Sequence, residues 1–128
     1  MFSFAVQGRQ IIIKASRPAK HADELKPLFN FLSNHISGNH AANLRCLIDA
    51  SMVKLGIWDI KWSVVKAMVH FRKSNTVNID KNVSAIAVVL SSDLLIKVAK
   101  FVLNSDSTDV LFTTSMDEAK TWLYGQNC

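Results

Sequence analysis

The chain has 128 residues, which is the length of one domain and is too short for two. Hydrophobic residues make up 49% of it and charged residues 20%, so it has enough apolar surface for a core, which excludes wholesale disorder. The net charge of +5 comes from Lys and Arg residues that are spread along the chain without a nucleic-acid-binding motif, so we expect no nucleic-acid partner.

The longest apolar run, residues Ala85 to Leu90, is far shorter than the roughly 20 residues of a membrane-spanning helix. The first ten residues lack the basic segment and long apolar segment of a signal peptide. Cys46 lies in an apolar run and Cys128 at the C-terminus, which disfavours a disulfide bond between them. We therefore expect no membrane span, a cytoplasmic location and reduced cysteines.

Alternating apolar residues predict an N-terminal β-hairpin. Every second residue from 2 to 6 is Phe or Val, and a second apolar run after Gly8 includes Ile11 and Ile13. Pro18 ends the second strand because it lacks an N–H and favours an extended predecessor.

A helix is predicted next, because apolar residues recur at spacings of three and four: Ala22, Leu25, Phe29, Leu32 and Ile36. Pro27 must lie in the first turn of this helix, so we expect a start near Ala22 to Glu24, with Asp23 as a cap. Ser37-Gly38-Asn39 is typical of a helix end.

The segment Asn43 to Val53 is predicted to be the centre of the sheet. Its continuous apolar run, Asn43 to Ala50, is typical of a parallel strand that is buried on both faces. A helix is predicted from Ile57 to Lys73, with two neighbouring apolar stripes. One stripe should face the sheet; the other, which contains Trp58 and Trp62, packs on a neighbouring helix or forms a partner or dimer surface.

Ser74 to Asn82 is predicted to be a polar loop, and Val83 to Leu90 a central strand. Helix caps at residues 91 to 93 precede a helix to Val102, and a turn is expected at residues 104 to 107. Val110 to Thr113 should form a short strand, and Ser115 has the capping-box spacing that starts a last helix.

The resulting order is ββαβαβαβα. It predicts an α/β fold in which residues 1–128 form one domain, with a mostly parallel sheet, an antiparallel N-terminal hairpin at its edge and helices as covering layers.

Several kinds of site are not indicated by the sequence. The four histidines lack the spacing of metal ligands, so no metal site is expected. The four glycines are isolated, which excludes a dinucleotide fingerprint or a phosphate-binding loop, so we expect no cofactor. No catalytic signature is present, and we expect no catalytic residues and no enzymatic activity.

The candidate binding residues are instead identified by their position in the predicted sheet, because the carboxyl ends of parallel strands form the usual ligand crevice. Here those ends carry Asp49, Ser51, Ser91 and Ser92. Ser92 and its neighbour Asp93 serve better as helix caps than as ligand contacts. Asp49 follows an apolar strand, where its carboxylate must reach solvent, cap a local N–H or bind something.

The segment Leu111 to Leu123, LFTTSMDEAKTWL, has an aromatic strand end followed by Asp-Glu-Ala and Trp-Leu. This pattern resembles the closing strand and helix of SpoIIAA-like (STAS) domains, and especially their STAS/SEC14 branch. Leu44 to Val53 resembles the family's central strand, and the resemblance covers nearly the whole chain. Phospho-switching members carry an Asp-Ser-Ser-Gly turn where this chain has Gly56-Ile57-Trp58-Asp59, so no phosphoacceptor role is carried over, and none is assigned to Ser51.

The resemblance and the missing catalytic set favour a non-enzymatic protein-interaction or regulatory binding domain. The wide apolar face of the second helix suggests that it contacts a protein partner or forms a homodimer through Trp58 and Trp62. The alternative that the resemblance implies is a carrier or sensor of a small apolar, lipid-like ligand. In that alternative the apolar second helix and the polar strand ends would line the pocket.

Overall fold

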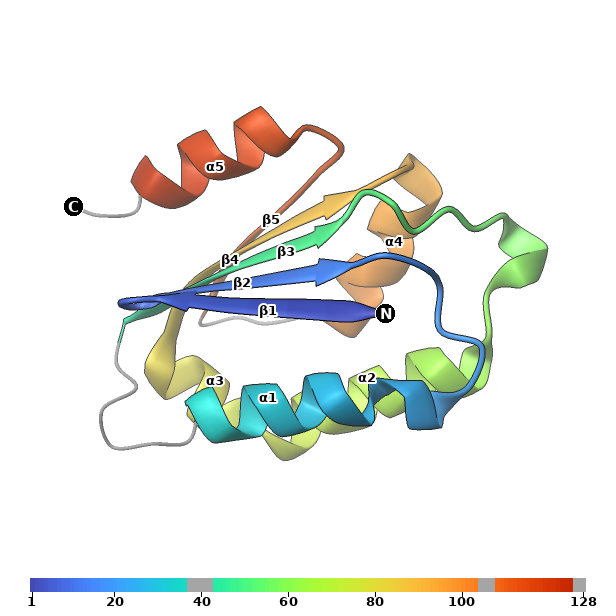
Figure 1. The fold of residues 1–128 in the computed structure, drawn as a ribbon, viewed down its shortest axis with the longest axis horizontal. Helices are drawn as coiled ribbons and strands as arrows, with labels where there is room; N and C mark the ends of the chain where they lie inside the picture. Colours follow the sequence, from blue (N-terminus) through green and yellow to red (C-terminus); the bar gives the residue numbers. More distant parts are fainter. Residues whose placement is uncertain (37–42, 104–107, 126–128) are drawn as a thin grey trace.

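The computed structural model of the chain describes residues 1–36, 43–103 and 108–125 (Figure 1). Five strands form one sheet in the order β1-β2-β3-β4-β5. The strands are β1 (Phe2–Gln7), β2 (Gln10–Ala15), β3 (Leu44–Ala50), β4 (Val83–Leu90) and β5 (Asp109–Thr113). β1 pairs antiparallel with β2 and the other pairs are parallel, which confirms the predicted mixed sheet in a single α/β domain.

The hairpin turns sharply at Gly8 and Arg9, because Gln7 and Gln10 are already paired in register. Gly8 has a φ of 59°, a left-handed conformation that glycine adopts without strain. At the open end of the hairpin, the Met1 carbonyl accepts hydrogen bonds from the Ser16 N–H at 2.9 Å and from its hydroxyl at 3.0 Å. These contacts hold the N-terminus against the end of β2.

The helices form two unequal layers, because parallel strands that follow one another in the sheet place their connecting helices on one face. On that face lie α1 (Lys26–Ile36), α2 (Trp62–Ser74), α3 (Thr76–Asn82) and α4 (Asp93–Val102) (Figure 1). Of the helices in the described part of the chain, α5 (Met116–Gly125) is the one on the opposite face. In the described part of the chain, no helix has the length and apolar character needed to cross a membrane.

Each face of the sheet has its own core. The side of the sheet toward α1 to α4, called the main face below, carries Ile11, Ile13, Cys46, Ile86, Val88 and Leu90. The side toward α5, called the α5 face, carries Leu47, Ala85, Ala87 and Val89, packed against Ala119 and Leu123. β4 is buried on both faces, which confirms its predicted interior position.

The predicted loop from Ser74 to Asn82 is wrong, because residues Thr76–Asn82 form α3. The segment is polar in composition, but one side of the helix is buried. Ile79 packs on the main core, and the buried Asn82 side chain donates a hydrogen bond to the Ile36 carbonyl at the end of α1. These tertiary contacts stabilise a helix that its sequence alone does not favour.

The single helix predicted from Ile57 to Lys73 is also wrong. A 3-10 turn, η2 (Ile57–Asp59), is closed by a hydrogen bond of 3.0 Å from the Gly56 N–H to the Asp59 carboxylate. Ile60 and Lys61 are extended, and α2 begins only at Trp62. Trp58 and Trp62 therefore do not share a helix face.

The first helix starts differently from the prediction as well. Residues Ala22–Leu25 form a 3-10 turn, η1, and α1 follows from Lys26. Glu24, not Asp23, accepts the hydrogen bonds of the N–H groups that precede η1. Asp23 instead makes an exposed ion pair of 3.5 Å with Lys26. The predicted helix end at residues 37–39, the turn at 104–107 and Cys128 lie outside the described residues.

Candidate functional site

The polar side chains at the end of β3 bond to one another. The Asp49 carboxylate accepts hydrogen bonds from the Ser51 N–H at 3.0 Å and from the Ser51 hydroxyl at 2.6 Å. Asp49 therefore caps a local N–H, which is one of the three roles open to it from the sequence. A ligand role for either residue stays a prediction.

The serines at the end of β4 also make structural hydrogen bonds. The Ser91 hydroxyl donates to the Val53 carbonyl at 2.7 Å, which joins the segments that follow β4 and β3. The Ser92 hydroxyl accepts from the Leu95 N–H at 3.3 Å and so caps α4, as expected. The fold brings these serines close to the segment after Asp49 and Ser51, but their hydroxyls serve the loops and the helix start.

The two tryptophans of the candidate partner surface are exposed. Trp58 in η2 is 93% exposed, and Trp62 at the start of α2 is 64% exposed. The large apolar ring of tryptophan is usually mostly buried, so this degree of exposure is unusual. Both tryptophans are exposed, but the predicted helical stripe is interrupted by the extended Ile60 and Lys61. A partner surface formed by the two stays a prediction.

A cavity of about 300 Å³ lies between the main face of the sheet and the helices that cover it. The strands contribute Ile13, Cys46, Ile48, Ile86 and Val88. The helices contribute Leu28, Leu32, Val64, Met68, Ile79, Leu95 and Ala99. Burial of the Cys46 thiol in this apolar setting raises its pKa to about 12, so the thiol stays protonated.

Among the described residues that line the cavity, four are charged: Arg17, Asp59, Lys61 and Arg72. Arg17 lies after β2, Asp59 and Lys61 lie between β3 and α2, and Arg72 is in the last turn of α2. The remaining lining is apolar. The cavity thus suits a hydrocarbon group and has few groups that could hold a polar molecule in its interior.

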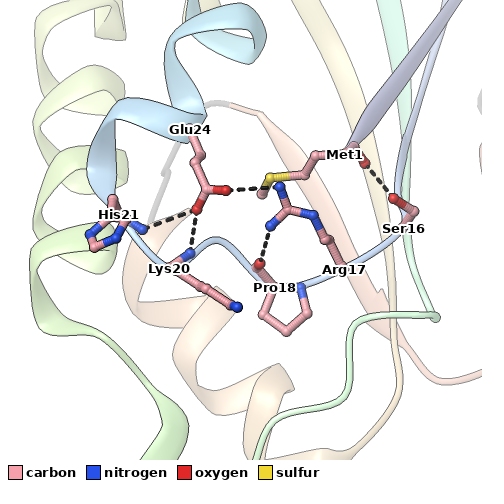
Figure 2. Close-up of polar contacts among 7 residues, drawn as sticks. All are labelled: Met1, Ser16, Arg17, Pro18, Lys20, His21 and Glu24. Carbon is pink, nitrogen blue, oxygen red and sulfur yellow. Dashed lines mark hydrogen bonds and ion pairs between the residues drawn. The ribbon is translucent and has the colours of Figure 1, made fainter.

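A hydrogen-bonded cluster holds the segment between β2 and α1 beside the cavity (Figure 2). The Glu24 carboxylate accepts from the Lys20 and His21 N–H groups and pairs with the Arg17 guanidinium at 2.9 Å. The backbone N–H of Lys20, then Arg17 and the N–H of His21, lower the pKa of Glu24 to about 2. Glu24 therefore organises one wall of the cavity, a role that the sequence did not predict.

Aromatic and amide contacts join the helices around the cavity. Phe29 of α1 stacks on Phe71 of α2 with ring centroids 4.5 Å apart, and Phe31 of α1 stacks on Phe4 of β1 at 4.3 Å. The Asn82 bond to Ile36 joins α3 to α1. α1 also contacts the sheet, because Leu28, Phe31 and Leu32 pack on the core of the main face.

The alternative drawn from the sequence was an apolar pocket lined by the second helix and the polar strand ends. Residues of α2 do line the cavity, whereas the strand-end residues Asp49, Ser51, Ser91 and Ser92 are not among its lining residues. The lining residues of the cavity are ordinary apolar core residues by type and spacing, and no pattern separates them from a filled core. One signal was available: the apolar surface from Ile57 to Lys73 is wider than a helix on an open sheet needs. Part of that surface lines the cavity.

No protein-family model and no curated protein matches the chain. Among solved structures, the chain is similar to an uncharacterized protein from the DUF3478 family with a SpoIIAA-like fold, from Shewanella loihica PV-4. The TM-score is 0.55 with 15% sequence identity, over 96% of this chain and 92% of that chain. The likeness extends across the whole fold, and it confirms the SpoIIAA-like architecture that the closing strand and helix indicated.

Proposed function

We propose that the protein binds a small apolar or amphipathic ligand in the cavity between the main face and the helices, as a carrier or sensor and without catalysis. The observation that carries this proposal is the cavity itself. Its volume of about 300 Å³ lies at the lower end of the range of ligand pockets, and its lining is apolar apart from four residues.

The effect of unfilled space on the stability of the fold also supports a ligand-binding role. Lining side chains that face an unfilled space lose contacts with neighbouring atoms, and this loss of dispersion attraction destabilises the fold. A hydrocarbon group in the cavity would restore contacts to the lining side chains and so stabilise the fold.

Native mass spectrometry of protein purified without denaturation tests the proposal, together with thermal shifts across a panel of lipids and fatty acids. Val88→Phe fills the cavity from β4, whereas Val77→Phe adds the same group at the exposed surface of α3. We expect an adduct and thermal stabilisation for the wild type and for Val77→Phe, and neither for Val88→Phe. Absence of any adduct or thermal shift in the wild type would contradict the proposal.

The stability of Val88→Phe gives an independent measurement. In a cavity the added ring is accommodated and stability is kept or raised. In a filled core the same change overpacks the site and costs about 1 to 3 kcal/mol. Chemical denaturation of the two variants distinguishes these cases, with Val77→Phe as the matched control.

A second function, contact with a protein partner or a second copy of the chain, is favoured by the exposure of Trp58 and Trp62. Exposed tryptophans are enriched at interface cores. Size-exclusion chromatography with light scattering tests the homodimer, with Trp58→Ala and Trp62→Ala as variants. We expect a dimer that either change weakens; a wild type that stays monomeric at high concentration would exclude the homodimer.

A further inference from the structure

The cavity differs in chemistry at its two ends. Three of its four charged lining residues, Arg17, Asp59 and Lys61, follow the carboxyl ends of β2 and β3. Parallel strands bring these ends to the same edge of the sheet, where the connections to α1 and α2 leave the strands (Figure 1). One end of the cavity is therefore charged, and it lies at an edge of the sheet.

The opposite end of the cavity is apolar, and a hydrogen bond joins two helices beside it. Ile36, Ile79 and Val83 line it, and the Asn82 side chain joins α3 to the end of α1 by its bond to the Ile36 carbonyl. Arg72 is the charged lining residue on this side; it is half-buried and has interactions of its own. A ligand with one polar end would therefore place that end beside Arg17 and Lys61.

The carboxylates at the charged end already have partners. Asp59 accepts the Gly56 N–H, and Glu24 accepts two backbone N–H groups and the Arg17 guanidinium. The Lys61 ammonium has no hydrogen bond or ion pair within residues 1–36, 43–103 and 108–125, and it lines the cavity. Arg17 is paired with Glu24 and Asp59 keeps its negative charge, so Lys61 is the charged lining residue at this end whose side chain has no partner among the described residues. An anionic group would pair with its ammonium.

We infer that the cavity binds a single-chain amphiphile whose hydrocarbon chain lies in the interior and whose anionic end lies beside Lys61 and Arg17. This inference rests on the proposed ligand-binding function and adds the class of ligand. A carboxylate or a phosphate monoester would supply the anionic end, and either one accepts hydrogen bonds from an ammonium and a guanidinium.

Calorimetric titration with a long-chain fatty acid, with the alcohol and the alkyl phosphate of the same chain length, and with acetate tests the inference. The acid and the phosphate should bind about tenfold tighter than the alcohol, and acetate should not bind detectably. Lys61→Gln should reduce the preference for the acid over the alcohol about fivefold while leaving the affinity for the alcohol unchanged. Lys66→Gln, on the exposed side of α2 and outside the cavity, is the matched control and should change neither value.

The outcomes are separable. If the acid and the alcohol bound with equal affinity, or if Lys61→Gln and Lys66→Gln lost the preference for the acid equally, the inference of an anionic end would be overturned. The proposed ligand-binding function would still stand. If acetate bound as tightly as the fatty acid, the site would recognise an anion without using the hydrocarbon chain of the ligand. That result would overturn the inference of an amphiphilic ligand. No binding by any of the long-chain compounds would overturn both proposals.

Discussion

The two faces of the sheet are packed in different ways. On the α5 face, β4 presents Ala85, Ala87 and Val89, all at most 1% exposed, and a single helix covers them with Ala119 and Leu123, both fully buried. On the main face, β4 presents the larger Ile86, Val88 and Leu90, yet four helices leave a cavity of about 300 Å³ above them.

Small side chains explain the close packing of α5, because alanine lets a helix backbone approach the sheet and fill the space between them. On the main face the helices pack on the strands and also contact one another, through Phe29 and Phe71 and through Asn82. The contrast shows that the α5 face is closely packed and that the main face leaves free space beneath its helices.

The largest expected effect is loss of packing on the α5 face. Leu123→Ala should lower the free energy of unfolding by about 3 to 5 kcal/mol, because the fully buried side chain leaves a cavity among closely packed neighbours. Leu32→Ala, at a half-buried residue that lines the cavity, should lower it by about 1 to 2 kcal/mol. Urea denaturation measures both changes, and equal losses would show that the faces are equally well packed.

Enlarging a side chain should also distinguish the two faces, with a smaller difference in the free energy of unfolding. Ala87→Leu on the α5 face adds volume where none is free, and should lower the free energy of unfolding by about 2 kcal/mol. Ala99→Leu on α4 extends into the cavity and should be neutral or stabilising. Denaturant midpoints of the two variants provide the measurement, and a comparable loss in Ala99→Leu would contradict the presence of free space on the main face.

The smallest effect concerns the Glu24 cluster at the wall of the cavity. Because its folded pKa is lowered from 4.5 to about 2, the Glu24 carboxylate stabilises the fold above pH 4.5, and this contribution is lost as the pH falls toward 2. Glu24→Gln should therefore lower the Tm at pH 7 and leave it unchanged near pH 2. Glu118→Gln, at an exposed residue on α5, is the control. A Tm difference for Glu24→Gln that persists at pH 2 would show a loss independent of the charge.

Local patterns predicted most of the fold. The alternation from Phe2 to Val6 and the apolar runs at Leu44 and Val83 correspond to observed strands. The capping serines also bond as expected: Ser92 accepts the Leu95 N–H, and Ser115 accepts the Glu118 N–H at 3.2 Å. These features depend on neighbours within a few residues, so their chemistry can be read along the chain.

The candidate site was harder to predict. Trp58 and Trp62 were assigned to one helical stripe, but the Asp59 bond to Gly56 and the extended Ile60 and Lys61 separate them. Lys61 carries no signal in the sequence that places it at a cavity. Its importance follows only from the positions of the elements that surround it.

The sequence by itself determined the order of the strands and of the helices other than α3, the mixed sheet and the caps of α4 and α5, because periodicity and capping act over short separations. The tertiary structure alone decided that Thr76–Asn82 forms a helix, that Glu24 holds Arg17, and that the main face encloses a cavity. The physical reason is that apolar side chains with the same spacing can fill a core or surround a space. The distance between the layers, which is set by contacts between residues far apart in the chain, selects between the two.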